Sequence, residues 1–307
     1  MRQAKRLVIT GATGFIGGRL LDAALDRGME VVALARDPGK IQRRDRPGLS
    51  IRTWEFGDSL PAVGDADAIC HLAATIPRNF EDPGEAARCF EANALSSLSL
   101  ASQAADQGIG QFVYFSSGQI YSTKATLASE DASTYPMGRA TYYLASKLAG
   151  ELCVQALGKS RGLDVTVLRL ASVYGPGMHG RGMLPNFIRR LASGETVTVQ
   201  NGGAYCVDLV YADDVADLAL RAVDMKAAGI FNVGTGEARS SLDVAHAIAR
   251  IVGADRSLIV VEGTAEPHGF AALDIAKASD MLGYRPARLE DGLAAWERTG
   301  QLTNFST

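Results

Sequence analysis

Short apolar segments alternate with longer segments of helical periodicity through the first half of the chain. Helical patterns cover residues 15–27, residues 85–107 and the segment that contains Tyr143, and the apolar segments around them are RLVIT, EVVALA, AICHLAA, QFVYFSS and DVTVLRL. These segments lack the polar alternation of a strand with one wet face, so we expect them to be buried on both faces. The alternation predicts an α/β fold with a doubly wound parallel sheet.

The pattern becomes less regular after residue 174. Glycines and prolines cluster at 175–185, TVTVQNGGAY has the pattern of a hairpin-like strand and turn, and GIFNVGTG has that of another core strand. We therefore expect a first domain at 1–174, with further core elements from about 205–233. A smaller, interleaved C-terminal domain, mainly at 175–307, is expected to bind the substrate.

The composition is ordinary for a globular protein. The chain has 307 residues, of which 47% are hydrophobic and 21% charged, and its formal net charge is -3. This balance gives no reason to expect nucleic acid or an anionic membrane as a partner. MRQAKRLVIT runs directly into GATG, which predicts a strand and a turn rather than a signal peptide, and no apolar segment approaches the length of a membrane span. Since the four cysteines are scattered without ligand spacing, we expect a cytoplasmic protein with reduced thiols and no metal site.

A glycine-rich loop follows the first predicted strand. In LVITGATGFIGG, Gly11, Gly14 and Gly17 lie between that strand and the first helix. Glycines there permit a tight turn, close approach of the backbone to a pyrophosphate and close packing of helix on strand, and a helix N-terminus favours negative charge. We therefore predict a Rossmann-like dinucleotide-binding domain, in which the cofactor also contacts the loop residues Thr13, Phe15 and Ile16.

The end of the second predicted strand bears on which dinucleotide binds. An acid there usually holds the ribose hydroxyls of NAD, whereas VVALARDPGK has Ala35 followed by Arg36. A guanidinium can pair with the 2′-phosphate of NADP through forked, charge-assisted hydrogen bonds. NADP is therefore favoured, and NAD stays the alternative if Arg36 is solvated and Asp37 bonds the ribose.

The segment TYYLASK contains the candidate catalytic pair. Tyr143 and Lys147 lie one turn apart on a predicted helix and share a face. Tyr142 is rotated from Tyr143 by about 100° and is expected to pack. An ammonium beside a phenol favours the phenolate, which would make Tyr143 a proton carrier near neutral pH. Such a pair arises often by chance, so other motifs must support it.

The order of these motifs resembles the extended short-chain dehydrogenase/reductase superfamily, which contains nucleotide-sugar epimerases, dehydratases and 4-ketoreductases. The resemblance covers nearly the whole chain, through the glycine loop, HLAA, YFSSGQIY, the Tyr143–Lys147 pair, YGPG, YADDVADLAL, FNVGTGE and DMLGYRP. It implies that Tyr143 is the acid/base. It also implies that Lys147 lowers the pKa of Tyr143 and bonds the nicotinamide ribose.

The same resemblance implies roles for further residues. Ser117, four residues before the last tyrosine of YFSSGQIY, would hold the reacting oxygen of the substrate. Asp58 would bond the adenine amino group, Ala73 and Ala74 would be backbone that passes the cofactor, and Asn93 would be an asparagine buried in a helix. Each also has a simpler interpretation, as a turn residue, as small core residues or as a polar helix side chain.

Two departures from the family pattern narrow the function. The first concerns dehydratases of the family, which have an Asp-Glu pair where Gly118 and Gln119 follow the serine of this chain. A dehydratase is therefore not expected.

The second departure concerns the arginines that clamp a substrate diphosphate in nucleotide-sugar members. Val207 occupies the first such position, and EPHGFAA offers only His268 near the second. Either Arg181 or Arg189 substitutes for the clamp, or the substrate carries no diphosphate.

The sequence thus predicts an NADP-dependent oxidoreductase that interconverts a keto group and a secondary alcohol on a sugar or a nucleotide-linked sugar. The alternatives are an NAD-dependent 4-epimerase of the UDP-hexose type and an NADP-binding sensor without catalysis. Retention of the serine, tyrosine and lysine together counts against the sensor. The helical segment 93–105 and the helix of Tyr143 could pair across a twofold axis in a homodimer, although burial within one subunit explains the same pattern.

Overall fold

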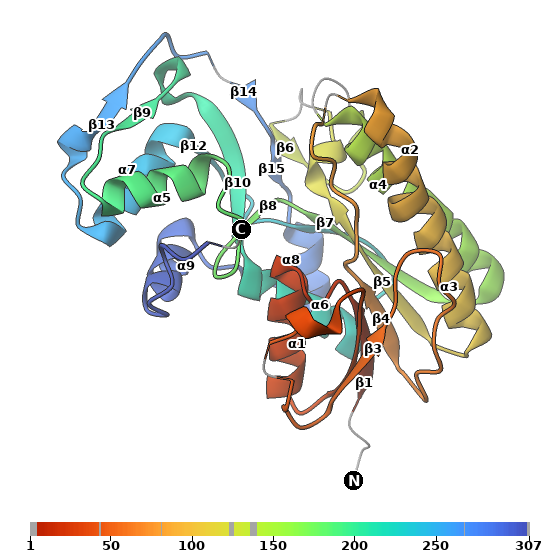
Figure 1. Cartoon of the computed structure of the whole chain (residues 1–307). Coiled ribbons are helices and arrows are strands. Elements are labelled where there is room, and N and C mark those ends of the chain that lie inside the picture. Colours follow the sequence, from red (N-terminus) through yellow and green to blue (C-terminus); the bar gives the residue numbers. More distant parts are fainter. Residues whose placement is uncertain are drawn as a thin grey trace.

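A seven-stranded parallel sheet forms the centre of the larger part of the molecule (Figure 1). The computed structural model describes residues 5–42, 44–80, 82–122, 126–135, 140–266 and 268–305. The strands lie in the order β11-β7-β5-β4-β1-β2-β3, and each neighbouring pair is parallel. Their bounds are β1 Arg6–Thr10, β2 Glu30–Ala35, β3 Leu49–Thr53, β4 Ala68–His71, β5 Gln111–Ser117, β7 Asp164–Leu170 and β11 Gly229–Val233. The predicted doubly wound α/β fold is confirmed.

Helices cover both faces of this sheet (Figure 1). One layer contains α1 (Phe15–Asp26), α6 (Ala212–Asp224) and α8 (Ala276–Leu282), and the other contains α2 (Ala86–Phe90), α3 (Ser96–Asp106) and α4 (Thr141–Arg161). Alternate residues of β5 enter opposite layers, because side chains alternate along a strand. Val113 and Phe115 pack on the side of α1 and α6, whereas Phe112 and Tyr114 pack on the side of α3 and α4. The strand sequences lack polar alternation because both faces of the sheet are buried.

The smaller part of the molecule has its own apolar core. Its central strand β10 (Tyr205–Tyr211) pairs with β12 (Ala238–Ser240), β14 (His268–Gly269) and β8 (Ser172–Tyr174). Helices α5 (Met183–Ala192), α7 (Ser241–Val252) and α9 (Leu289–Glu297) pack around this core, in which Trp296 is fully buried.

Two sequence expectations differ from this arrangement. TVTVQNGGAY does not form a hairpin, because β9 (Val197–Val199) pairs in parallel with β13 (Ile259–Val261) and a short 3-10 turn separates it from β10. β10 lies in the small sheet, whereas α6 and β11, which follow it, lie with the large sheet. A domain boundary at residue 174 stays a prediction.

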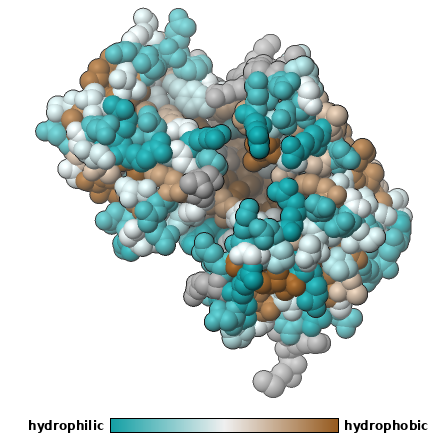
Figure 2. Space-filling model, in the orientation of Figure 1, coloured by the Kyte–Doolittle hydropathy of each residue, from teal (hydrophilic) through white to brown (hydrophobic). Residues whose placement is uncertain are grey.

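The two parts are interleaved in the chain and border a common recess. β15 (Ala272–Leu273), near the C-terminus, pairs with β6 (Leu127–Ala128) from the first half. Figure 2 shows the recess between the two parts, with hydrophobic side chains at its floor. The carboxyl ends of the parallel strands meet there, which is where open α/β sheets bind their ligands.

A buried ion pair joins α4 to the sheet. Arg169 of β7 donates to both carboxylate oxygens of Glu151, and both side chains are almost completely buried. Arg169 also donates to the Tyr121 hydroxyl, which donates in turn to Asn232 Oδ1 on β11. Since each polar group of this network has a partner, the network can persist in the core.

Close packing of α4 generates a prediction about Gly150. A Cβ atom there would overlap the Tyr114 hydroxyl and the Asn93 carbonyl oxygen. We expect Gly150→Ala to lower the free energy of unfolding by about 1–3 kcal/mol, as overpacking does. Gly18→Ala is the matched control, since a Cβ at this helical glycine meets its nearest neighbour at 3.7 Å. Alanine should be neutral or stabilising there. Urea unfolding measures both, and equal effects of the two changes would refute the packing argument.

Candidate functional site

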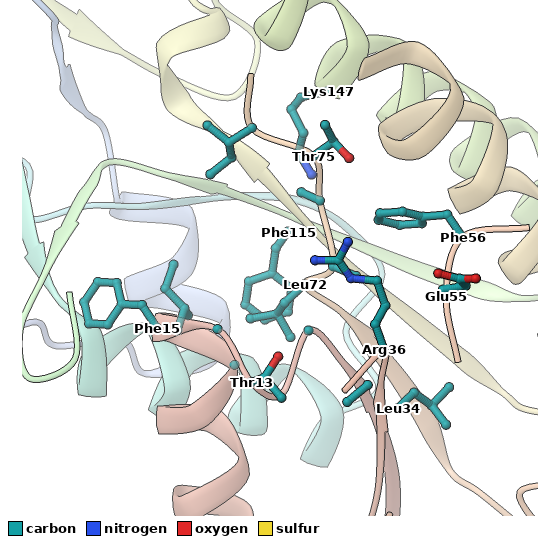
Figure 3. Close-up of a pocket in the computed structure, with 18 of the residues that line it drawn as sticks. Thr13, Phe15, Leu34, Arg36, Glu55, Phe56, Leu72, Thr75, Phe115 and Lys147 are labelled. Atoms are coloured by element: carbon teal, nitrogen blue, oxygen red, sulfur yellow. The ribbon is translucent and has the colours of Figure 1, made fainter. Parts of the chain in front are cut away.

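A cavity of about 490 Å³ opens at the carboxyl ends of β1, β2, β4 and β5 (Figure 3). The sequence-predicted residues that line it are Gly11, Thr13, Gly14, Phe15, Ile16, Gly17, Arg36, Ala73, Ala74, Tyr143 and Lys147. Residues that sequence reasoning did not select also line it: Leu34, Ala35, Trp54, Glu55, Phe56, Leu72, Thr75, Ile76, Arg88, Phe115, Ser116 and Leu170. Ser117, Asp58, Arg181 and Arg189 are not in its lining.

The glycine loop forms one wall of the cavity. Gly11 has φ +70°, and a Cβ there would lie 2.7 Å from the Ala73 amide nitrogen. A Cβ on Gly17 would overlap the Gly11 carbonyl oxygen, so the helix begins in direct contact with the turn. Helix α1 starts at Phe15 without a side-chain cap, which leaves its first N–H groups to face the cavity. This cradle of amides and partial positive charge fits a pyrophosphate.

The end of β2 presents Arg36 to the cavity. Figure 3 shows its guanidinium directed toward the middle of the cavity, near Glu55 and Phe56. The neighbouring Asp37 is used differently: its Oδ1 accepts a hydrogen bond from the Gly39 amide at 2.9 Å and caps a 3-10 turn. Asp37 is thus absent from the lining, although it was the sequence alternative for bonding the ribose.

The turn after β3 places Glu55 where Asp58 was expected. Asp58 Oδ2 accepts a hydrogen bond from the Glu55 amide at 2.9 Å, which closes the turn and keeps the Asp58 carboxylate out of the lining. Glu55 and Phe56 follow β3 with only Trp54 between, and this position is the signal that could have found them. Locating it requires knowing that the strand ends at Thr53.

Helix α4 contributes Tyr143 and Lys147 to the cavity lining. Figure 3 shows Lys147 at the end of the cavity opposite Leu34. The Lys147 ammonium lies 4.3 Å from the centroid of the Tyr114 ring, a cation–π distance. The Phe80 ring packs edge-on against Tyr143 with centroids 6.3 Å apart. Tyr142 is not in the lining, so only one of the adjacent tyrosines faces the cavity.

Asn93 ties this helix to the loop after β4. It lies in a π-helical turn (Glu91–Leu95) between α2 and α3 and is fully buried. Its Oδ1 accepts from the Thr75 amide, and its Nδ2 donates to the Thr75 carbonyl and to Ser146 Oγ. The Ser146 hydroxyl then donates to the Tyr143 carbonyl at 2.7 Å. The side chain therefore positions the cavity wall relative to α4, the helix of the candidate catalytic pair.

The two serines at the end of β5 point in different directions. Ser117 Oγ accepts from the Gln119 amide at 3.2 Å and caps the 3-10 turn Gly118–Ile120, outside the cavity lining. Ser116 does line the cavity, and its hydroxyl has no hydrogen-bond partner among the described residues. Strand alternation predicts the opposition but not which serine faces the cavity.

Burial dominates the acidity of the candidate catalytic pair. It lowers the pKa of Lys147 from 10.5 to about 7, an effect that Glu151 partly opposes. Burial, with a smaller contribution from Cys89, raises the pKa of Tyr143 to about 12. The expected lowering of the Tyr143 pKa by Lys147 is thus not found in the ligand-free protein, because burial penalises the phenolate.

The candidate substrate-binding arginines lie in the smaller part of the molecule. Arg189 lies over the Phe305 ring at 5.7 Å, and Arg181 is exposed. Val207 is buried in the apolar core, and His268 is exposed beside the Tyr205 ring. In these positions neither arginine reaches the cavity.

Neither a metal-binding cluster nor a membrane-spanning helix is found among the described residues. Within the described ranges, no group of three or more His, Cys, Asp or Glu side chains could hold a metal ion, and the four cysteines are free thiols. No helix in the described part of the chain combines the length and the apolar character needed to cross a bilayer.

Known proteins resemble this chain over almost its full length. The description "NAD dependent epimerase/dehydratase family" matches residues 7–234. The chain is 32% identical to UDP-glucose 4-epimerase of Mycolicibacterium smegmatis, over 94% of this chain and 96% of that protein. It is 28% identical to dTDP-glucose 4,6-dehydratase of Streptomyces antibioticus, over 94% and 90% respectively.

Solved structures agree with this similarity. dTDP-glucose 4,6-dehydratase from Streptomyces venezuelae, with NAD bound, has a TM-score of 0.80 and 26% identity, over 96% of this chain and 98% of that one. UDP-glucose 4-epimerase from Thermotoga maritima, with UDP-glucose, has a TM-score of 0.81 and 25% identity, over 96% and 99%.

The lowered pKa of Lys147 predicts a pH dependence of stability. Between pH 7 and 10.5 the unfolded lysine is protonated and the folded one is not, so the free energy of unfolding rises with pH in this window. Lys147→Met removes this contribution. The free energy of unfolding of the wild type, measured relative to that of Lys147→Met, should therefore rise by about 1–2 kcal/mol between roughly pH 7 and 8.5. Urea unfolding at both pH values measures it, and a constant difference would mean that Lys147 keeps an ordinary pKa.

Proposed function

The chain belongs to the NAD dependent epimerase/dehydratase family, and on this premise we propose that it is an NADP-dependent oxidoreductase that interconverts a keto group and a secondary alcohol on a sugar-type substrate. It is an enzyme of the extended short-chain dehydrogenase/reductase type. The observation that carries the finer proposal is the position of Arg36 in the cavity while Asp37 caps a turn. A cation at the end of β2 suits a 2′-phosphate.

Two parts of the cavity support binding of a dinucleotide: the glycine loop, and the residues around Arg36. Gly11, Gly14 and the first turn of α1 would hold the pyrophosphate. Phe56 and Glu55 would contact the adenine, in place of Asp58, and Arg36 would pair with the 2′-phosphate. A bound nicotinamide supplies or accepts the hydride.

Proton transfer is the task of this chain's own residues. With its raised pKa, Tyr143 is a phenol at neutral pH and suits donation of a proton to the oxygen of a carbonyl under reduction. Lys147 would bond the cofactor ribose, and its protonated form, which predominates below a pH of about 7, would supply positive charge close to Tyr143. Ser117 accepts from the Gln119 amide, so its hydroxyl proton stays free to hold the substrate oxygen.

The type of substrate is inferred from the side chains that the smaller part of the molecule offers to a diphosphate. Val207 is an uncharged, buried side chain, and Arg189 lies against Phe305, so neither offers a cation to a diphosphate. An unpaired diphosphate would lose affinity on desolvation. We therefore favour a keto sugar or polyhydroxylated substrate, and a nucleotide-linked sugar requires Arg181 or Arg189 to move over the cavity.

The second candidate is an NAD-dependent 4-epimerase. It is favoured by the 32% identity to the Mycolicibacterium smegmatis UDP-glucose 4-epimerase and by the NAD bound to the Streptomyces venezuelae relative. A dehydratase is disfavoured, because Gly118 and Gln119 supply no acid after Ser117. A sensor is disfavoured because Tyr143 and Lys147 both line the cavity.

A homodimer through α3 and α4 stays a prediction. Leu152 on α4 and Leu95 beside α3 are each more than half exposed, which suits helix pairing across a twofold axis. Sedimentation of the purified protein as a monomer would refute this arrangement.

Arg36 generates a prediction about cofactor choice. We expect NADP⁺ to bind more tightly than NAD⁺ by roughly ten- to a hundredfold, the worth of a charge-assisted hydrogen bond. Arg36→Ala should remove this difference without weakening NAD⁺ binding. Arg88→Ala is the control, because Arg88 is another arginine in the lining and should not discriminate between the cofactors. Isothermal titration measures all six pairs of protein and cofactor, and equal affinities in the wild type would favour the epimerase.

Turnover separates the two functions. With the proposed activity, a keto sugar from a panel of free, UDP-linked and dTDP-linked forms consumes NADPH stoichiometrically. Tyr143→Phe should reduce the rate by about 10²–10⁴ through loss of the proton donor, while NADPH affinity stays nearly unchanged. NADPH absorbance and titration measure the two effects. Interconversion of UDP-glucose and UDP-galactose without net NADPH consumption would instead establish the epimerase, and full activity of Tyr143→Phe would remove Tyr143 from the mechanism.

A further inference from the structure

Two buried polar atoms lack hydrogen-bond partners among the described residues, and both belong to residues that line the cavity. They are the hydroxyl oxygen of Ser116 and the indole nitrogen of Trp54. Ser116 is only 5% exposed. Buried polar groups in folded proteins nearly always have partners, and an unpaired one costs free energy. Both residues line one cavity, so a molecule bound there is a candidate partner for each.

The position of Ser116 identifies the end of the cavity where such a ligand would meet it. Along β5, Ser116 lies on the same side as Tyr114, because the two are separated by one residue. The Tyr114 ring lies under the Lys147 ammonium, and its hydroxyl donates to the Asn93 carbonyl. Ser116 is one step closer to the carboxyl end of the strand, where α4 begins with Tyr143. We therefore assign it to the end of the cavity lining with Tyr143 and Lys147.

Ser117 does not compete for this task. Its hydroxyl oxygen already accepts the Gln119 amide, and it is absent from the lining. Ser116 Oγ can both donate and accept, so it can meet a carboxamide or a ribose hydroxyl.

We propose that Ser116 is a direct ligand of the bound dinucleotide at its nicotinamide end, and that its hydroxyl completes its hydrogen bonding there. The inference rests on the dinucleotide site of the proposed function and adds a residue that the Ser117–Tyr143–Lys147 set does not contain. A serine with a structural role would stabilise the ligand-free protein. A serine that binds a ligand would not stabilise the ligand-free protein, because its hydroxyl is unpaired until the ligand binds.

The test compares Ser116→Ala with Ser117→Ala by two measurements. Thermal unfolding of the ligand-free protein should show Ser116→Ala at or above the wild-type midpoint, since an unpaired buried hydroxyl is removed. Titration with NADP⁺ should show affinity weakened by about two- to tenfold, the range of one net hydrogen bond. Affinity for adenosine 2′,5′-bisphosphate, which lacks both the nicotinamide ring and its ribose, should not change. Ser117→Ala should leave both affinities unchanged.

Other results overturn the proposal. A lower midpoint for ligand-free Ser116→Ala with unchanged NADP⁺ affinity would make Ser116 structural. Equal weakening toward both probes would remove the nicotinamide end as its partner. Ser116→Cys, which keeps the size of the side chain with a weaker donor, should bind NADP⁺ with intermediate affinity, and wild-type affinity would contradict the hydrogen bond. If wild-type protein binds neither NADP⁺ nor NAD⁺, the dinucleotide site itself fails, which is a distinct outcome.

Discussion

The close approach of helix α4 to strand β5 fixes both candidate catalytic side chains. Gly150 has no side chain, which lets the Tyr114 hydroxyl reach the Asn93 carbonyl across the contact. The Tyr114 ring in turn supports the Lys147 ammonium, and the Glu151–Arg169 ion pair holds the next turn of the helix against β7. Interiors are close-packed, so such a contact has few alternative arrangements. Tyr143 and Lys147 therefore lie on one rigidly packed helix, and the candidate cofactor cavity is built around this helix.

Much of the large sheet could be predicted from its apolar segments. The apolar segments of the sequence predict β1, β2, β4, β5 and β7, because strands buried on both faces have continuous apolar sequence. The smaller part was harder to predict. β9 pairs with β13, about sixty residues further along the chain, and its partner cannot be read from local turn residues. β10 has the same apolar character as a core strand, but it packs in the small sheet, since burial alone does not say which core a strand enters.

Some residues of the candidate site can be predicted from local sequence patterns, and others only from the three-dimensional structure. The glycine loop and the Tyr143–Lys147 spacing are local patterns, and both face one cavity. Glu55 and Ser116 depend on where a strand ends and which way it faces, and those facts are set by packing. The acidity of Tyr143 was expected from its neighbour Lys147, but burial decides it. Desolvation is a property of the whole environment, and no short motif encodes it.

The chain order of the large sheet has a consequence for synthesis on the ribosome. The edge strand β11 begins at Gly229, whereas its neighbour β7 ends at Leu170. At about 5–20 residues per second, the intervening segment takes roughly 3–12 s to be made. Throughout that interval the nascent sheet carries β7 as an open edge, with unpaired N–H and C=O groups that can recruit another chain. β11 thus covers the edge of β7 and becomes the terminal strand in its place. A molecular chaperone that protects β7 would be of most use to this protein between those two moments.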